Sequence, residues 1–201
     1  MINVEKIQAY EKDVLSDVAP SLEDQDIKQL IAWLNEKDDM LRYKSFLLLQ
    51  SRSQIYNDVY AHWDEFVAKL DCDNSYQRSL GLMLMAENAR WDETGWLDKN
   101  IDCYLNGCDD EKPVTVRQCI QGLAKIVPYK KQCYDAIVAR LIGIDISQRK
   151  ETQQKLLLID IITILKLIEK ESPREDIKRY IQNAMTGGIL DAKSKKMLAA
   201  L

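Results

Sequence analysis

The fold is decided by residues 109–127, which read DDEKPVTVRQCIQGLAKIV. The acidic residues 109–111 can meet the free N–H groups and the positive dipole end of a helix that starts after them. Pro113 suits the first helical position, because no backbone N–H is needed there. The aliphatic residues that follow recur at steps of four, three and four, on one face of a helix: Val116, Ile120, Leu123 and Val127. The stretch therefore predicts a polar turn followed by an amphipathic helix.

Weaker copies of this stretch recur along the chain and indicate an internal repeat. A cation follows each polar turn at spacings of 36 to 39 residues, at Arg42, Arg78, Arg117 and Lys155. Six residues after each cation lies an aliphatic residue: Leu48, Leu84, Leu123 and Ile161. The helix before each turn also ends on a leucine: Leu34, Leu70, Leu105 and Leu141. We therefore predict four helical pairs.

The predicted order begins with an N-terminal cap, residues 1–20, that holds one helix over residues 2–18. The four pairs follow over residues 21–53, 55–90, 92–128 and 131–170, with two further helices over residues 172–201. Residues 172–175, Ser-Pro-Arg-Glu, predict a capping box with proline at the first helical position. Gly187 and Gly188 should end that helix, and Asp191 should cap the last one.

Composition limits the fold class and the kinds of partner. Of 201 residues, 46% are hydrophobic and 30% charged, with only seven Gly and four Pro, so we expect a globular, all-α protein. The net charge of −4 disfavours nucleic acid and anionic membranes as partners. The apolar stretch 156–168 contains Asp160 and Lys166 and is too short to span a bilayer. Without a secretory signal at the N-terminus, the expected location is cytoplasmic.

The repeat length and an Asp-rich turn followed by arginine resemble the HEAT-repeat family. The residues that carry this resemblance are Asp38, Asp39, Arg42, Asp73, Arg78, Asp110, Pro113, Val116 and Arg117. Residues 110–121 are also similar to small bacterial HEAT-like proteins of unknown function. The resemblance implies one domain over residues 1–201, a right-handed α–α superhelix (a solenoid) of about ten or eleven helices. It also implies an Asp–Arg ladder between repeats. The fourth pair departs from the pattern, because Lys155 replaces the arginine.

A solenoid of this kind exposes a long concave surface, which suits a peptide or a helix of another protein. The second helices of the pairs should line that surface. We therefore expect a non-enzymatic, protein-binding scaffold or adaptor. The alternative is a DNA-binding enzyme similar to the HEAT-like alkylpurine DNA glycosylases, with Trp91 and Trp96 in an aromatic cleft. A third possibility is a homodimer formed through the apolar stretch Leu156–Ile168.

Few residues suggest chemistry. His62 is the only histidine and has no nucleophile motif beside it, so we interpret it as a helix-surface or packing residue. The five cysteines are best explained as reduced thiols. Three of them, Cys103, Cys108 and Cys119, could converge near one helix end and are the only candidates for a metal site. No phosphate-binding glycine loop is present. We expect no catalytic, cofactor-binding or metal-binding residues.

Overall fold

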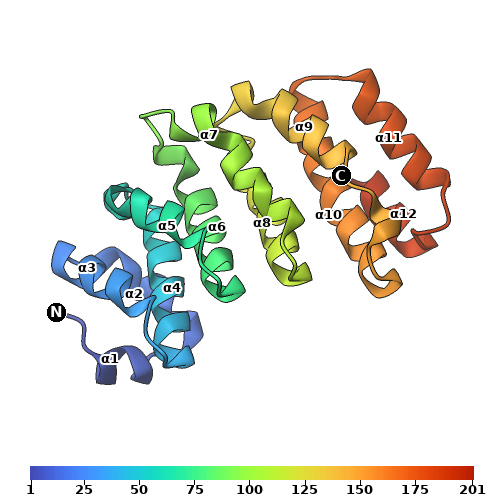
Figure 1. Ribbon diagram of the computed structural model, residues 1–201. Coiled ribbons are helices and arrows are strands. Elements are labelled where there is room, and N and C mark those ends of the chain that lie inside the picture. Colours follow the sequence, from blue (N-terminus) through green and yellow to red (C-terminus); the bar gives the residue numbers. More distant parts are fainter. The chain divides into compact units, whose positions relative to one another are not determined.

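The computed structural model describes residues 1–201 and contains helices but no strands, which confirms the all-α prediction (Figure 1). There are twelve α-helices and seven short 3-10 helices. The chain divides into two compact units, Met1–Glu93 and Thr94–Leu201, and the division falls two residues after the start of the third predicted pair. None of the helices combines the length and apolarity needed to cross a membrane.

In the first unit, α4 and α6 are the inner helices. Helices α2 and α3 pack on α4, α5 packs on α6, and α4 contacts α6. The α-helices are α1 (Val4–Ala9), α2 (Leu15–Val18), α3 (Asp24–Trp33), α4 (Asp39–Ser53), α5 (Trp63–Lys69) and α6 (Ser75–Asn88). The 3-10 helices are η1 (Lys12–Val14), η2 (Ala19–Ser21), η3 (Asp58–His62) and η4 (Ala89–Trp91).

In the second unit, α10 is the central helix and contacts α8, α9, α11 and α12. The α-helices are α7 (Trp96–Leu105), α8 (Pro113–Ile126), α9 (Tyr134–Ile142), α10 (Glu151–Glu171), α11 (Glu175–Thr186) and α12 (Ala192–Ala199). The 3-10 helices are η5 (Asn106–Asp109), η6 (Lys131–Cys133) and η7 (Ile146–Gln148).

The aliphatic stripe that predicted α8 is buried. The four residues that follow the repeat cations by six positions are fully buried as well, with relative exposures of 0%: Leu48, Leu84, Leu123 and Ile161. Burying a leucine or isoleucine side chain contributes about 1.5–3 kcal/mol. These equivalent positions therefore contribute to the core of both units.

The repeat cations Arg42 and Arg78 occupy equivalent places. Each guanidinium donates to the backbone carbonyl six residues earlier, at 2.8 Å for Arg42 to Glu36 and 2.7 Å for Arg78 to Cys72. Arg42 also pairs with Asp39 on its own helix and lies 4.4 Å from the ring centroid of Tyr76 on α6. Contact between these two repeats thus includes a cation–π interaction as well as packing.

The prediction of a single helix over residues 2–18 is wrong, and its division into α1 and α2 gives twelve helices rather than ten or eleven. The backbone is extended at Tyr10 and Glu11. There the carbonyl oxygens of Gln8 and Tyr10 accept hydrogen bonds from the buried Lys44 ammonium, at 2.7 and 2.6 Å. A buried ammonium needs such partners, so the break satisfies Lys44.

The capping box predicted at residues 172–175 is also wrong. Helix α10 runs to Glu171, and the Ser172 N–H donates to the Ile168 carbonyl at 2.8 Å, so Ser172 ends α10. Helix α11 begins only at Glu175, with Arg174 as its N-cap residue. The Arg174 guanidinium pairs with Asp135 and Asp176, which holds the start of α11 against α9.

Other predicted helix ends are confirmed. Pro113 is the first residue of α8, although Lys112 is the N-cap residue and none of the acidic residues 109–111 is. Gly187 ends α11, and the Asp191 carboxylate caps α12 by accepting the Ser194 N–H at 2.7 Å. The same carboxylate pairs with Lys155 at 2.9 Å, which ties α12 to α10.

Gly81 marks the closest approach of α6 to α5. A Cβ at this position would lie 2.7 Å from the Phe66 carbonyl oxygen and 3.0 Å from the Lys69 Cβ. We predict that Gly81→Ala lowers the free energy of unfolding by about 1–3 kcal/mol through overpacking, although alanine favours helix by about 1 kcal/mol. Urea denaturation followed by circular dichroism measures this change.

The control is Gly188→Ala, whose Cβ would meet nothing within 4 Å. An equal effect of both substitutions would contradict the prediction.

Asp191 should make stability depend on pH. The hydrogen bond from the Ser194 N–H, followed by the ion pair with Lys155, lowers the pKa of this carboxyl. Its contribution to stability is therefore complete above the unfolded-state pKa of about 4 and is lost as pH falls through the lower folded-state value. We expect the stability difference between wild type and Asp191→Asn to shrink as pH falls from about 6 to about 2. Denaturation at a series of pH values tests this, and a constant difference would contradict it.

Candidate functional site

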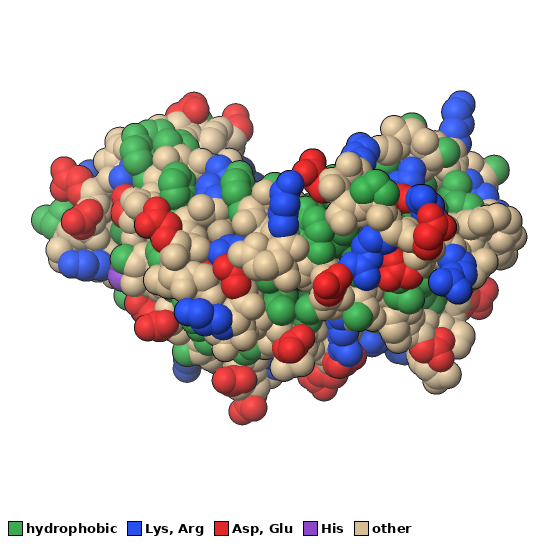
Figure 2. All heavy atoms as spheres, turned by 90° about the horizontal axis from the view of Figure 1, so that it is seen from above, with side chains coloured by type: hydrophobic (Ala, Val, Ile, Leu, Met, Phe, Trp, Pro, Cys, Tyr) green, Lys and Arg blue, Asp and Glu red, His purple; other side chains and the backbone are tan.

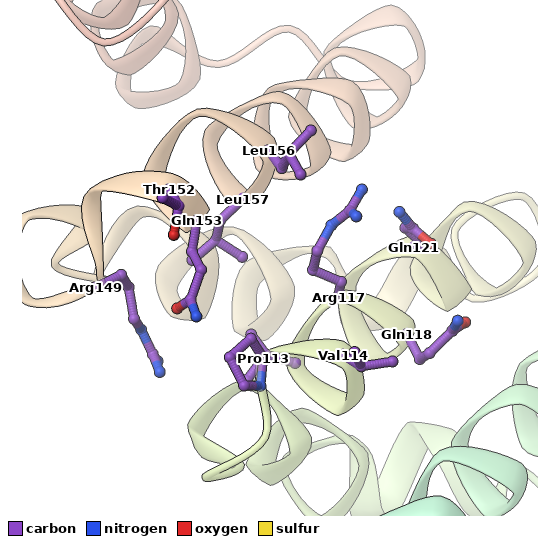
Figure 3. Close-up of a pocket in the computed structure, with 11 residues that line it drawn as sticks. Pro113, Val114, Arg117, Gln118, Gln121, Arg149, Thr152, Gln153, Leu156 and Leu157 are labelled. Carbon is purple, nitrogen blue, oxygen red and sulfur yellow. The ribbon is translucent and has the colours of Figure 1, made fainter.

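A groove between α8 and α10, with a cavity volume of about 230 Å³, is the strongest candidate for a binding site (Figure 3). Both helices are the second members of their predicted pairs. The groove lies entirely within the second unit. Its lining residues are Pro113, Val114, Val116, Arg117, Gln118, Gln121, Arg149, Thr152, Gln153, Leu156 and Leu157.

Aliphatic side chains line both walls of the groove. On α8, Val116 is buried while Val114 is 67% exposed, and on α10, Leu157 is buried while Leu156 is 42% exposed. Residues three and four apart lie on one face of a helix, so the lining residues of each helix form a stripe that faces the groove. The exposed side chains of Val114 and Leu156 therefore lie beside buried aliphatic residues, and no other part of this chain shields them from solvent.

Arg117 lies between the two helices and is fixed by a buried carboxylate (Figure 3). Its Nε and Nη2 donate to Asp160 on α10, at 2.6 and 3.2 Å, and the Gln121 amide donates to the same carboxylate at 3.0 Å. The hydrogen bond to Asp160 raises the pKa of Arg117, so this guanidinium stays charged. A two-point arginine–carboxylate pair also fixes the orientation of the guanidinium.

Arg149 lies at one end of the groove and Gln121 at the other (Figure 3). The Arg149 Nη2 donates to the Cys108 carbonyl at 3.1 Å, which anchors this side chain to η5. The lining residues include two arginines and no aspartate or glutamate. Asp160 balances the charge of Arg117, so Arg149 makes one end of the groove cationic, whereas acidic and basic side chains are interspersed on the face shown in Figure 2.

The size of the groove limits what it can hold. Pockets for small molecules and cofactors usually enclose about 300–1,000 Å³. At about 230 Å³ and open to solvent, this groove has room for a few side chains of a larger partner. Its glutamines and Thr152 can hydrogen-bond to a partner backbone.

The lone histidine lies outside this groove. His62 ends η3, and its Nδ1 lies 2.7 Å from the Glu65 carboxylate one turn later. The histidine side chain is 19% exposed. This arrangement ties η3 to the first turn of α5, which agrees with the interpretation of His62 as a helix-surface or packing residue.

Two of the three candidate metal ligands come together. The Sγ atoms of Cys108 and Cys119 lie 3.7 Å apart, and both residues are buried. Cys103 is half-buried on α7, and no group of three or more His, Cys, Asp or Glu residues is arranged to hold a metal ion. The cysteines therefore form a thiol pair.

The tryptophans considered for an aromatic cleft belong to different units. Trp91 ends η4, and its indole N–H donates to the Ser53 carbonyl at 2.7 Å, within the first unit. Trp96 begins α7 in the second unit. Each is half-buried. The Trp91 hydrogen bond holds η4 to the end of α4.

The apolar stretch considered for self-association is mostly internal to the second unit. Within Leu156–Ile168, the buried aliphatic residues are Leu157, Leu158, Ile161, Ile162, Ile164, Leu165 and Ile168. Leu156 is the exposed large residue of this stretch and lines the groove. Sequence reasoning did not identify the groove. The available signals were Val114 and Leu156, which are aliphatic residues just outside the buried stripes.

Comparison with models of known protein families gives no match, and comparison with curated proteins gives none either.

The Arg117–Asp160 pair should stabilise the contact between α8 and α10. We predict that Asp160→Ala lowers the free energy of unfolding by about 1–3 kcal/mol, because it removes a buried acceptor shared by Arg117 and Gln121. The matched control is Asp135→Ala, which removes a carboxylate that is 91% exposed and also pairs with an arginine. Its expected cost is about 0–1 kcal/mol. Chemical denaturation of both variants measures the difference, and equal losses would contradict the prediction.

Proposed function

We propose that this chain is a non-enzymatic protein-interaction scaffold of the HEAT-like type, and that the α8–α10 groove is a docking site. The partner is a segment of another protein that carries aliphatic side chains next to a carboxylate. The observation that carries this proposal is the pairing of exposed Val114 and Leu156 with Arg117 and Arg149 in one groove.

Both features of the groove support this choice of partner. The exposed aliphatic side chains would lose contact with water against similar side chains, and each buried methylene contributes about 0.8 kcal/mol. The planar guanidinium of Arg149 can donate hydrogen bonds to a carboxylate of the partner. No acidic residue lines the groove to compete with that carboxylate for Arg149. An enclosed small-molecule site has less support, because the groove is small and open.

The helical repeat also supports a scaffold. A period of 36 to 39 residues and buried aliphatic residues at equivalent positions agree with the resemblance to HEAT proteins. In such proteins the second helices of the pairs offer extended binding surfaces. Helices α8 and α10 are second helices in the third and fourth predicted pairs.

A displayed random-peptide library, selected on the full chain, tests the proposal. We expect enriched peptides to combine aliphatic residues with Asp or Glu. A synthetic version of an enriched peptide, followed by fluorescence anisotropy, should bind about tenfold or more weakly to Leu156→Asp and to Arg149→Glu. Thermal unfolding of each variant verifies that it is folded.

The control variant is Ile55→Asp, which alters an aliphatic residue of similar exposure, 47%, in the first unit. It should bind the peptide as wild type does. Equal affinity of all variants would refute the groove as the docking site. Binding of a labelled DNA duplex with a steep salt dependence would favour the DNA-binding alternative. Concentration-dependent sedimentation that Leu156→Asp abolishes would instead identify a second copy of this chain as the occupant.

A further inference from the structure

Cys108 and Cys119 form the closest pair of reactive side chains outside the groove. Cys108 lies in η5 and Cys119 in α8, eleven residues apart in the chain, and each has a relative exposure of 0%. Their Sγ atoms are 3.7 Å apart. Tyr104 makes two hydrogen bonds with Cys119. Its hydroxyl donates to the Cys119 carbonyl at 3.0 Å, and its carbonyl accepts from the Cys119 thiol at 3.4 Å.

We propose that Cys108 and Cys119 are an oxidation site, at which a hydroperoxide converts the two thiols into an intramolecular disulfide. The S–S bond of a disulfide is about 2.05 Å long, so the two sulfur atoms, now 3.7 Å apart, must move closer by about 1.6 Å. This approach has to come from rotation about the side-chain bonds together with any movement of η5 relative to α8.

The surroundings of the two thiols differ and assign their roles. A hydrogen bond from Cys119 lowers the pKa of Cys108 against the effect of burial, and the nearby Arg140 guanidinium lowers it further. Burial raises the pKa of Cys119 well above its ordinary value. Cys108 is therefore the nucleophile, since the thiolate is the reactive form, and Cys119 is the resolving thiol.

The reaction is balanced by one equivalent of hydrogen peroxide. The Cys108 thiolate attacks one peroxide oxygen, the O–O bond breaks, and the leaving hydroxide takes a proton from solvent to become water. Cys108 is now a sulfenic acid. The Cys119 sulfur then attacks the Cys108 sulfur, the S–O bond breaks, and the Cys119 proton leaves with the hydroxyl as a second water. Two thiols are oxidised and one peroxide is reduced.

A polar pocket lies next to Cys108, because it is lined by the residue that follows Cys108 in the chain. This pocket has a volume of about 270 Å³ and is lined in part by Asp109, Arg140 and Arg149. The Arg140 guanidinium interacts with the Cys108 thiol, and Arg149 donates to the Cys108 carbonyl. Arg140 pairs with Asp109 and its side chain is 32% exposed. This side chain has to move for the oxidant to pass from the pocket to Cys108.

Peptide mapping of the peroxide-treated protein tests the proposal. Trypsin leaves Cys103 and Cys108 in one peptide, residues 100–117, because Lys112 precedes Pro113. The experiment therefore uses the full chain with Cys103→Ser, reduced, freed of reductant, treated with hydrogen peroxide, alkylated and digested. We expect residues 100–117 to be joined to residues 118–125 with loss of two hydrogen atoms. This linked peptide should vanish when Cys108→Ala is added.

Wild-type protein digested with chymotrypsin provides a second measurement, since cleavage after Tyr104 and Leu105 separates Cys103 from Cys108 without any substitution. The linked peptides should appear there as well. Recovery of Cys108 and Cys119 as alkylated thiols, while half-buried Cys72 becomes sulfinic acid, would overturn the proposal. A disulfide between either residue and a different cysteine would also overturn it.

Discussion

Shared burial of aliphatic side chains between neighbouring helical pairs is the constraint on which this structure depends. A single pair of helices leaves one aliphatic face in water, and only the next pair can cover it. In the first unit α4 packs on α6, and in the second unit α8 packs on α10. The repeated positions Leu48, Leu84, Leu123 and Ile161 lie in these four inner helices and are fully excluded from solvent.

Buried cations add specificity to this non-directional packing. The Lys69 ammonium, at the end of α5, donates to the Asn35 and Gln77 side chains at 2.7 and 2.6 Å, which joins α5 and α6 to the turn between α3 and α4. The Arg52 guanidinium reaches the Ala19 and Pro20 carbonyls and also pairs with Asp58. A buried charge without partners is costly, so these contacts favour one register of helix against helix.

The groove follows from the same packing. Helices α8 and α10 are held together below the surface by their buried residues and by the Arg117–Asp160 pair. Val114 and Leu156 lie on the solvent side of this contact, outside the buried faces of α8 and α10, and their side chains remain exposed. The expected resemblance to HEAT proteins rests on turns and spacings in the sequence. The groove combines three residues of that pattern, Pro113, Val116 and Arg117, with residues outside it, such as Gln118 and Leu156, and sequence reasoning did not single it out as a site.

The sequence by itself determined the features that depend on neighbours within a few residues. The start of α8 at Pro113 follows from the fit of proline to the first helical position. The cap at Asp191 and the buried stripe of α8 follow from local capping and from the helical period. These interactions join residues no more than one or two turns apart, so they leave a readable pattern.

Only the tertiary structure decided the features whose partners are distant in the chain. The break after α1 depends on Lys44, 34 to 36 residues away, and the start of α11 depends on Asp135, 39 residues from Arg174. Arg117 finds Asp160 across 43 residues. Such contacts arise when packing brings helices together. The buried Lys44 ammonium overrides the local helical pattern because a buried charge must be satisfied wherever its partner lies.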